Sequence, residues 1–128
     1  MNGIVITTRN EVRPVMLIEP KLDSMQKFVG GYIEHVRPVN LKPPYCMIVN
    51  EEGRLDGLPV NLLGCFLYGS HVHGNPIVGD ILILKDGINE HGEADIVGLD
   101  TSEITTLSNE FRMMAGVLNK RLKGRFFK

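Results

Sequence analysis

Short apolar runs separated by turn-forming residues fill the first hundred positions of the chain. Residues 3–8 (GIVITT) and 13–20 (RPVMLIEP) are two such runs joined by a short polar link, which predicts two strands paired as a hairpin. VGDILILKDG is the strongest strand pattern, and the Asp86-Gly87 dipeptide predicts a turn directly after it. Together the apolar runs predict strands at residues 3–8, 13–20, 31–39, 45–50, 78–87 and 92–98.

A different spacing of apolar residues predicts helices. In KLDSMQKFVGG, Leu22, Met25, Phe28 and Val29 recur every three or four positions, and Gly30 is suited to end the helix in a left-handed conformation. Residues 62–67 are predicted as a short helix that Asn61 caps at its start and Gly69 ends, because an asparagine side chain accepts from a free backbone N–H.

A long helix is predicted near the end of the chain, where Thr101 or Ser102 is the expected cap. Its apolar face is expected to comprise Ile104, Leu107, Phe111, Met114 and Leu118. The resulting fold class is α+β: a mostly antiparallel sheet of about six strands, with one short helix before it and one longer C-terminal helix. Residues 1–118 are expected to form this single domain, and residues 119–128 a basic tail.

Composition and charge narrow the class of protein. The 128 residues carry 14 basic and 15 acidic side chains, a net charge of −1, which gives no overall attraction to nucleic acid or acidic lipid. The two cysteines, Cys46 and Cys65, lie within apolar runs and are interpreted as buried reduced thiols. No apolar run is long enough to span a membrane and no signal-peptide pattern occurs, so a cytoplasmic protein is expected.

The common catalytic motifs for phosphate binding, zinc proteolysis and serine hydrolysis do not occur in the sequence. His71 and His73 are the only pair of histidines spaced to meet one metal ion if the segment is extended, since alternate strand residues point the same way. The segment from His71 to Ile77 is, however, predicted as a polar loop. A metal-assisted hydrolase at this loop is one hypothesis, and no cofactor is otherwise expected.

Residues 50–61 (NEEGRLDGLPVN) combine a turn with side chains that suit binding. Glu51 and Glu52 are adjacent carboxylates, and Gly53 is expected at a positive φ in the turn. The asparagines at both ends, Asn50 and Asn61, are suited to local turn hydrogen bonds and equally to reading an amide or a base edge. A charged turn is the simpler interpretation of this stretch.

The C-terminal stretch NKRLKGRFFK concentrates positive charge next to two phenylalanines, and no acidic residue follows Glu110. Cations reach phosphates and aromatic rings stack on bases, which makes this tail a candidate nucleic-acid contact. The alternative is a helix end whose cations oppose the helix dipole. The candidate nucleic-acid-binding residues are Lys120, Arg121, Lys123 and Arg125.

Four segments in fixed order, FVGGYIEHV, IVNEEGRLDGLPVN, LYG and IVGDILIL, resemble the family called domain of unknown function 3846. The resemblance covers about residues 14 to 100 and implies a small single-domain protein of phages and mobile elements. It implies no catalytic residue. The matching glycines and Pro59 have structural explanations, whereas four matching polar residues are the candidates for ligand binding: Glu34, Asn50, Glu51 and Asn61.

The function expected from this resemblance is binding without catalysis. The protein is expected to sequester a nucleotide-type signal or to mask a host defence protein, in a pocket formed within one chain or across a homodimer. The pocket is expected where NEEG, LPVN and the strand of Glu34 meet. The two alternatives are a nucleic-acid-associated protein that uses its basic tail and the metal-assisted hydrolase at His71 and His73.

Overall fold

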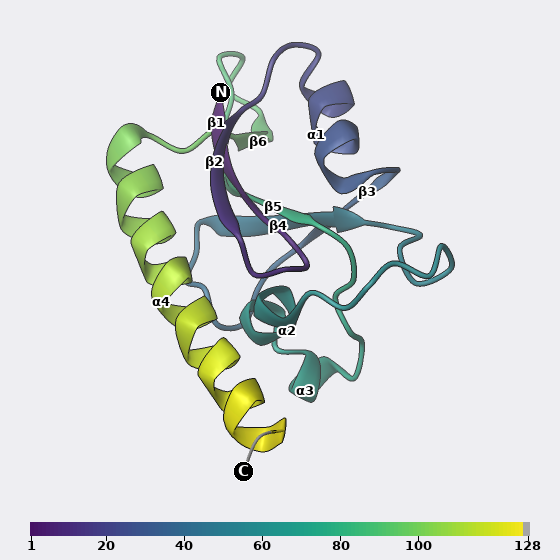
Figure 1. Ribbon diagram of the computed structural model, residues 1–128. Coiled ribbons are helices and arrows are strands. Elements are labelled where there is room, and N and C mark those ends of the chain that lie inside the picture. The colour runs from purple at the N-terminus through teal and green to yellow at the C-terminus, as the bar shows by residue number, and fades with distance from the viewer. Residues whose placement is uncertain (127–128) are drawn as a thin grey trace.

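The computed structural model describes the backbone of residues 1–126 and the side chains as far as Lys120. It confirms an α+β fold with a mostly antiparallel sheet and a long C-terminal helix (Figure 1). The elements, in chain order, are β1 (Asn2–Ile6), β2 (Val12–Met16), α1 (Lys21–Val29), β3 (Ile33–Val36), β4 (Tyr45–Asn50), α2 (Leu62–Tyr68), α3 (Ser70–His73), β5 (Ile81–Ile88), β6 (Ala94–Val97) and α4 (Thr101–Phe126).

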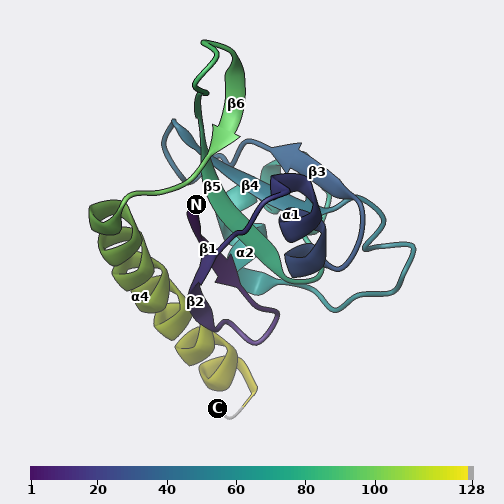
Figure 2. The same ribbon diagram turned by 90° about the horizontal axis from the view of Figure 1, so that it is seen from above.

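The sheet has the strand order β2-β1-β5-β4-β3, and every pairing within it is antiparallel. The predicted hairpin of the first two strands is confirmed, with Ile4 opposite Pro14. Pro14 lies in an edge strand, where a missing N–H is tolerated. The sixth strand, β6, pairs with the second half of β5, and the hairpin that these two strands form projects from the sheet (Figure 2).

Strand β5 is the centre of the fold because both of its faces are covered. Its first four residues, Ile81–Leu84, have no exposed surface, as expected for a continuous apolar run. Ile81 and Ile83 point into the core formed with α2 and α4, while Leu82 and Leu84 point into a second core formed with α1. Alternate side chains of this one strand therefore pack against helices on both faces of the sheet.

The helices cover opposite faces of the sheet, as Figure 2 shows with α1 and α4 on either side of β5. Helix α4 buries Leu107 and Phe111 against the first face, so the predicted apolar stripe is confirmed at its centre. Helix α1 buries Met25 and Val29 against the second face, whereas Leu22 of the predicted stripe is half exposed. No helix in the described part of the chain combines the length and the apolar composition needed to cross a membrane.

Several predicted element boundaries are wrong, among them the ends of two strands: β2 stops at Met16 rather than residue 20, and β3 is shorter than the predicted range 31–39. The predicted turn at Asp86-Gly87 lies inside β5, where these residues pair with Ile96 and Asp95 of β6. The chain turns later, where the Asn89 side chain accepts hydrogen bonds from the backbone N–H groups of His91 and Glu93. The cap of α4 is Asp100, not the predicted Thr101 or Ser102. The Asp100 side chain accepts a hydrogen bond from the backbone N–H of Glu103, and the Glu103 side chain accepts one from the backbone N–H of Asp100.

Gly87 is required in β5 because β6 lies too close for a side chain. A Cβ atom at this position would lie 2.6 Å from Cγ2 of Val97, a stiff β-branched side chain. We expect Gly87→Ala to lower the free energy of unfolding by about 1–2 kcal/mol, as is usual when a packed site is overfilled. Urea denaturation of Gly87→Ala, Val97→Ala and the double variant tests this. The double variant should lose less than the sum of the two single losses, and additive losses would contradict the proposed clash.

Candidate functional site

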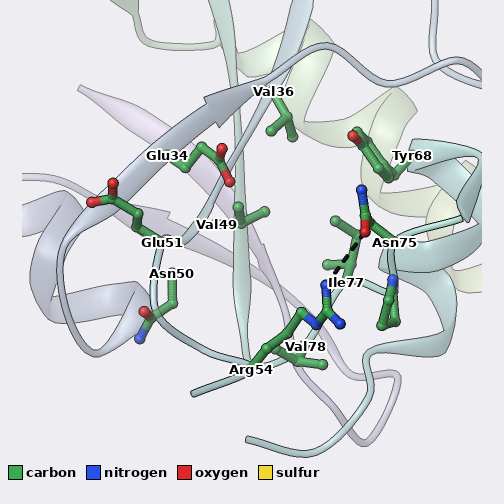
Figure 3. A pocket seen from close by; sticks show the side chains of 11 residues that line it. Glu34, Val36, Val49, Asn50, Glu51, Arg54, Tyr68, Asn75, Ile77 and Val78 are labelled. Carbon is green, nitrogen blue, oxygen red and sulfur yellow. Dashed lines mark hydrogen bonds between the residues drawn. The ribbon is translucent and has the colours of Figure 1, made fainter. Parts of the chain in front are cut away.

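A cavity of about 260 Å³ lies between the open edge of the sheet and the segment that leads into β5 (Figure 3). Strands β3 and β4 supply one wall, and residues 75–78 with Tyr68 supply the other. Val36 and Val49 present apolar side chains from the first wall, and Ile77 presents one from the second. The cavity volume is slightly below the range typical of small-molecule sites, roughly 300–1,000 Å³.

Charged and polar groups reach the cavity from both walls. Glu34 projects from β3 on the same face as Val36 and Val49, since Glu34 is opposite Val49 in the strand register. Arg54 comes from the turn after β4 and donates a hydrogen bond from Nη1 to Oδ1 of Asn75, at 3.3 Å. That bond joins the turn to the segment before β5, so a carboxylate and a guanidinium face one apolar space.

Asn50 and Glu51 also line the cavity, but their side chains turn away from its centre (Figure 3). Asn50 is buried; its Nδ2 donates to the carbonyl oxygen of Val29, and its Oδ1 accepts from the backbone N–H of Glu52 at 2.8 Å. The amide of Asn50 therefore fixes the end of α1 and the start of the turn. Glu51 is exposed at the rim, and its backbone N–H donates to the carbonyl oxygen of Tyr32.

Asn61 lies outside this cavity and has a structural role. Its side chain has no exposed surface, and its Oδ1 accepts from the backbone N–H of Gly64, which confirms the predicted cap of α2. Its Nδ2 donates to two carbonyl oxygens, those of Ile6 at 3.0 Å and Gly79 at 2.9 Å. Both N–H donors and the oxygen of this amide are engaged within the fold and the side chain is fully buried, so Asn61 offers no group to a ligand.

The turn of residues 50–61 differs from the prediction at its glycines. Gly53 does not have a positive φ; the left-handed residue of the turn is Gly57, at φ 70°. Gly53 is required for space, because a Cβ atom there would lie 2.8 Å from Cγ2 of Val78. The segment LPVN, expected to border the pocket, does not line the cavity, whose second wall comes from residues 75–78 instead.

The predicted loop at His71 and His73 is a single helical turn, α3, so the two side chains do not project in the same direction as extended backbone would place them. His73 packs against Tyr68, with 4.6 Å between ring centroids. Within the described residues, the only group of three side chains close enough to share a metal ion lies elsewhere, and neither histidine belongs to it. The structure therefore gives these histidines no third metal ligand.

The two cysteines are free and lie on different faces of the sheet. Cys46 is fully buried, and burial, together with the carboxylate of Asp86, raises the pKa of its thiol to about 12. Cys65 is partly exposed, and its Sγ accepts a hydrogen bond from the backbone N–H of Ile77. Burial is thus confirmed for Cys46 and only partial for Cys65.

The basic tail is described only in part. Helix α4 continues to Phe126, and Lys120 is exposed near its end. The side chains of Arg121, Lys123 and Arg125 lie outside the described residues. A nucleic-acid contact at this tail stays a prediction.

The protein thus has an α+β fold with a cavity of about 260 Å³ beside the β3 edge of its sheet. The chain belongs to the family described as domain of unknown function (DUF3846), whose profile matches residues 1–115. This confirms the resemblance inferred from the sequence and extends it to β1 and most of α4. A search of curated proteins gave no match.

Among solved structures, the chain is similar to the one described as the crystal structure of small RNA methyltransferase HEN1, with a TM-score of 0.52 and 15% sequence identity. The similarity covers 81% of this chain and only 15% of that protein, so it concerns one part of a much longer chain. At this identity the likeness concerns the fold alone.

Sequence reasoning missed three residues that shape the cavity: Arg54, Tyr68 and Asn75. Arg54 lies within residues 50–61, and the only sequence feature that indicates it is a single cation among carboxylates. Tyr68 and Asn75 become neighbours of Glu34 only through the pairing of β3, β4 and β5, which no local pattern reveals.

Proposed function

We propose that the protein binds a small polar molecule in the cavity between Glu34 and Arg54. The observation that carries the proposal is a carboxylate and a guanidinium that line the same partly apolar space of about 260 Å³. Few, converging polar groups on an apolar lining are typical of ligand sites. The proposed role is binding, because the carboxylate and the guanidinium supply directional polar contacts and the apolar side chains supply contact area.

The charges of the lining define the class of ligand. The charges of Glu34 and Arg54 cancel, and Glu51 adds one negative charge at the rim, so the lining carries a formal charge of −1 and opposes a ligand with several phosphates. Carboxylates accept hydrogen bonds from amino and imino groups, and the ring of Tyr68 offers a surface for a planar group. A nucleoside-type molecule with at most one phosphate, placed at Arg54, fits these groups best.

Sequestration of a host signal is the biological role that we propose for this binding. A protein that removes a signal needs affinity and no reactive group, which agrees with the lining described above. In this role the protein acts in the cytoplasm of the host cell. A masking contact with a host defence protein is the alternative within the same role.

Native mass spectrometry of gently purified protein is the test. We expect the wild type to carry the additional mass of one small molecule per site. Glu34→Gln and Arg54→Gln should each weaken binding by roughly 10- to 100-fold, the loss usual for a hydrogen bond to a charged group, and so lose the bound mass. Added nucleosides should raise the melting temperature of ligand-free wild-type protein. They should not raise that of either variant.

Glu90→Gln is the matched control, because Glu90 lies in the turn between β5 and β6 with a side chain 88% exposed. It should retain the ligand. A wild-type protein that carries no small molecule, and that no nucleoside or nucleoside monophosphate stabilises, would contradict the proposal. Capture of a host protein by the wild type and by both cavity variants alike would favour the masking role.

A further inference from the structure

A second group of side chains lies on the opposite face of the sheet from the cavity. His35, Cys46 and Asp86 come from three neighbouring strands, and each offers one ligand atom within 4.8 Å of the other two. Nε2 of His35 lies 2.7 Å from Oδ1 of Asp86. It is the only such group among the residues that the structure describes.

The register of the strands brings these residues together. His35 is opposite Ile48 and Cys46 is opposite Leu84, so both point to the face that α1 covers, together with Leu84. Asp86 follows Leu84 by two residues in β5 and therefore points the same way. A nitrogen, a sulfur and an oxygen donor thus converge on one spot of a rigid sheet.

The three side chains of this group differ in burial. Cys46 has no exposed surface, while the side chains of His35 and Asp86 are 30% and 36% exposed. The sulfur itself is closed to solvent, so an ion reaches it only when the partly exposed side chains of His35 and Asp86 move apart. Arg37 holds the other carboxylate oxygen of Asp86, with 3.5 Å between Nε and Oδ2, which leaves Oδ1 directed at His35.

We propose that His35, Cys46 and Asp86 bind a divalent transition metal ion of the zinc class, with a fourth position open to solvent. Imidazole, thiolate and carboxylate are the ligands that zinc takes in proteins. Bond lengths of about 2.0–2.3 Å place the donors of a tetrahedral site about 3.3–3.6 Å apart. His35 and Asp86 need to separate by less than an ångström from their present hydrogen bond, and both side chains have solvent on one side.

Charge and position support the site further. A thiolate and a carboxylate together balance the two positive charges of the ion, and binding replaces the thiol proton with the metal. The site is separate from the cavity, because Glu34 and His35 are adjacent in β3 and point to opposite faces. The proposal therefore stands or fails independently of the proposed ligand site.

Titration of reduced, metal-free, full-length protein with Co²⁺ tests the proposal. We expect one equivalent to bind and to produce the sulfur-to-cobalt charge-transfer absorption together with intense tetrahedral d–d bands. Added Zn²⁺ should abolish both signals by displacing the cobalt. His35→Gln and Asp86→Asn should each weaken binding by more than the roughly 10-fold loss usual for an outer-shell change, because each removes a ligand atom.

Matched variants separate this site from others. Cys65→Ala keeps Cys46 and should retain the full charge-transfer signal, and His71→Gln should do the same. Cys46→Ala should lose the signal while keeping the circular dichroism spectrum of the wild type. If Cys46→Ala does not fold, His35→Gln decides, since that side chain is partly exposed. A wild type without charge-transfer absorption, or an unchanged signal in His35→Gln, would overturn the proposal.

Discussion

Replacement of Asn61 by alanine is expected to lower the free energy of unfolding by about 3–7 kcal/mol. Asn61 is fully buried and its amide makes three hydrogen bonds, to Gly64, Ile6 and Gly79. Alanine removes the cap of α2, worth about 1 kcal/mol. It also leaves two buried carbonyl oxygens without this donor, at roughly 1–3 kcal/mol each.

The position of Asn61 explains why the loss should be large. Ile6 ends β1, Gly79 precedes β5 and Gly64 lies in the first turn of α2, so one side chain joins three elements. Asn61→Asp is a second informative variant. It keeps the oxygen that caps α2, but it loses both donors and turns a carboxylate oxygen toward two carbonyl oxygens. We expect it to be at least as unstable as Asn61→Ala at neutral pH.

Urea denaturation of the purified variants measures these losses. Asn40→Ala is the matched control, because the exposed Asn40 makes a single side-chain hydrogen bond, to the carbonyl oxygen of Phe66 at 2.7 Å. It should lose less than about 1.5 kcal/mol. Equal losses of unfolding free energy in Asn40→Ala and Asn61→Ala would contradict the large stabilisation inferred for the three hydrogen bonds of the buried Asn61 amide.

Local patterns predicted most elements of this fold because each pattern reports the burial of one face. The run ILIL predicted a strand; the structure places it at the centre of the sheet, where two neighbouring strands and two covering layers bury it. Local patterns failed where pairing overrides them. Asp86-Gly87 has the composition of a hairpin turn, yet β6 extends the ladder past it and the chain turns only after Ile88.

The candidate site was predictable only in part, for a related reason. Alternation in β3 separated Glu34 from His35, and the structure places them on opposite faces of the sheet. The cap at Asn61 is a local signal, whereas its bonds to Ile6 and Gly79 span 55 and 18 positions along the chain. Side chains that meet through sheet pairing, such as Arg54 with Asn75, have no counterpart in sequence spacing.

Glu103 is the carboxylate on which the stability of this fold should depend most clearly at acidic pH. Its Oε1 accepts from Nζ of Lys85 at 2.7 Å and from the backbone N–H of Asp100 at 3.0 Å, and its side chain is only 16% exposed. Burial by itself would raise the pKa of Glu103. The N–H of Asp100, the ammonium of Lys85 and the hydroxyl of Tyr45 outweigh burial and lower that pKa to about 2.

The lowered pKa of Glu103 fixes the sign of the pH dependence. The folded protein holds the ionised form more strongly than the unfolded chain, in which the pKa is near its ordinary value of 4.5. The stabilisation is therefore complete above about pH 5 and is lost as the pH falls toward about 2. A pKa difference of this size corresponds to roughly 3 kcal/mol at neutral pH. Burial and the Glu103 carboxylate raise the pKa of Tyr45 to about 12, so its hydroxyl remains a donor throughout.

Denaturation of wild type and Glu103→Gln at a series of pH values isolates this contribution. We expect the wild type to be more stable by about 2–3 kcal/mol near pH 7, and the difference to shrink toward zero near pH 2. Glu110→Gln, at an exposed position of the same helix, is the control and should stay within about 0.5 kcal/mol of the wild type at every pH. A stability difference that stays constant with pH would contradict this account. It would mean that Glu103→Gln destabilises the fold through altered packing or capping geometry and not through loss of the ionised carboxylate.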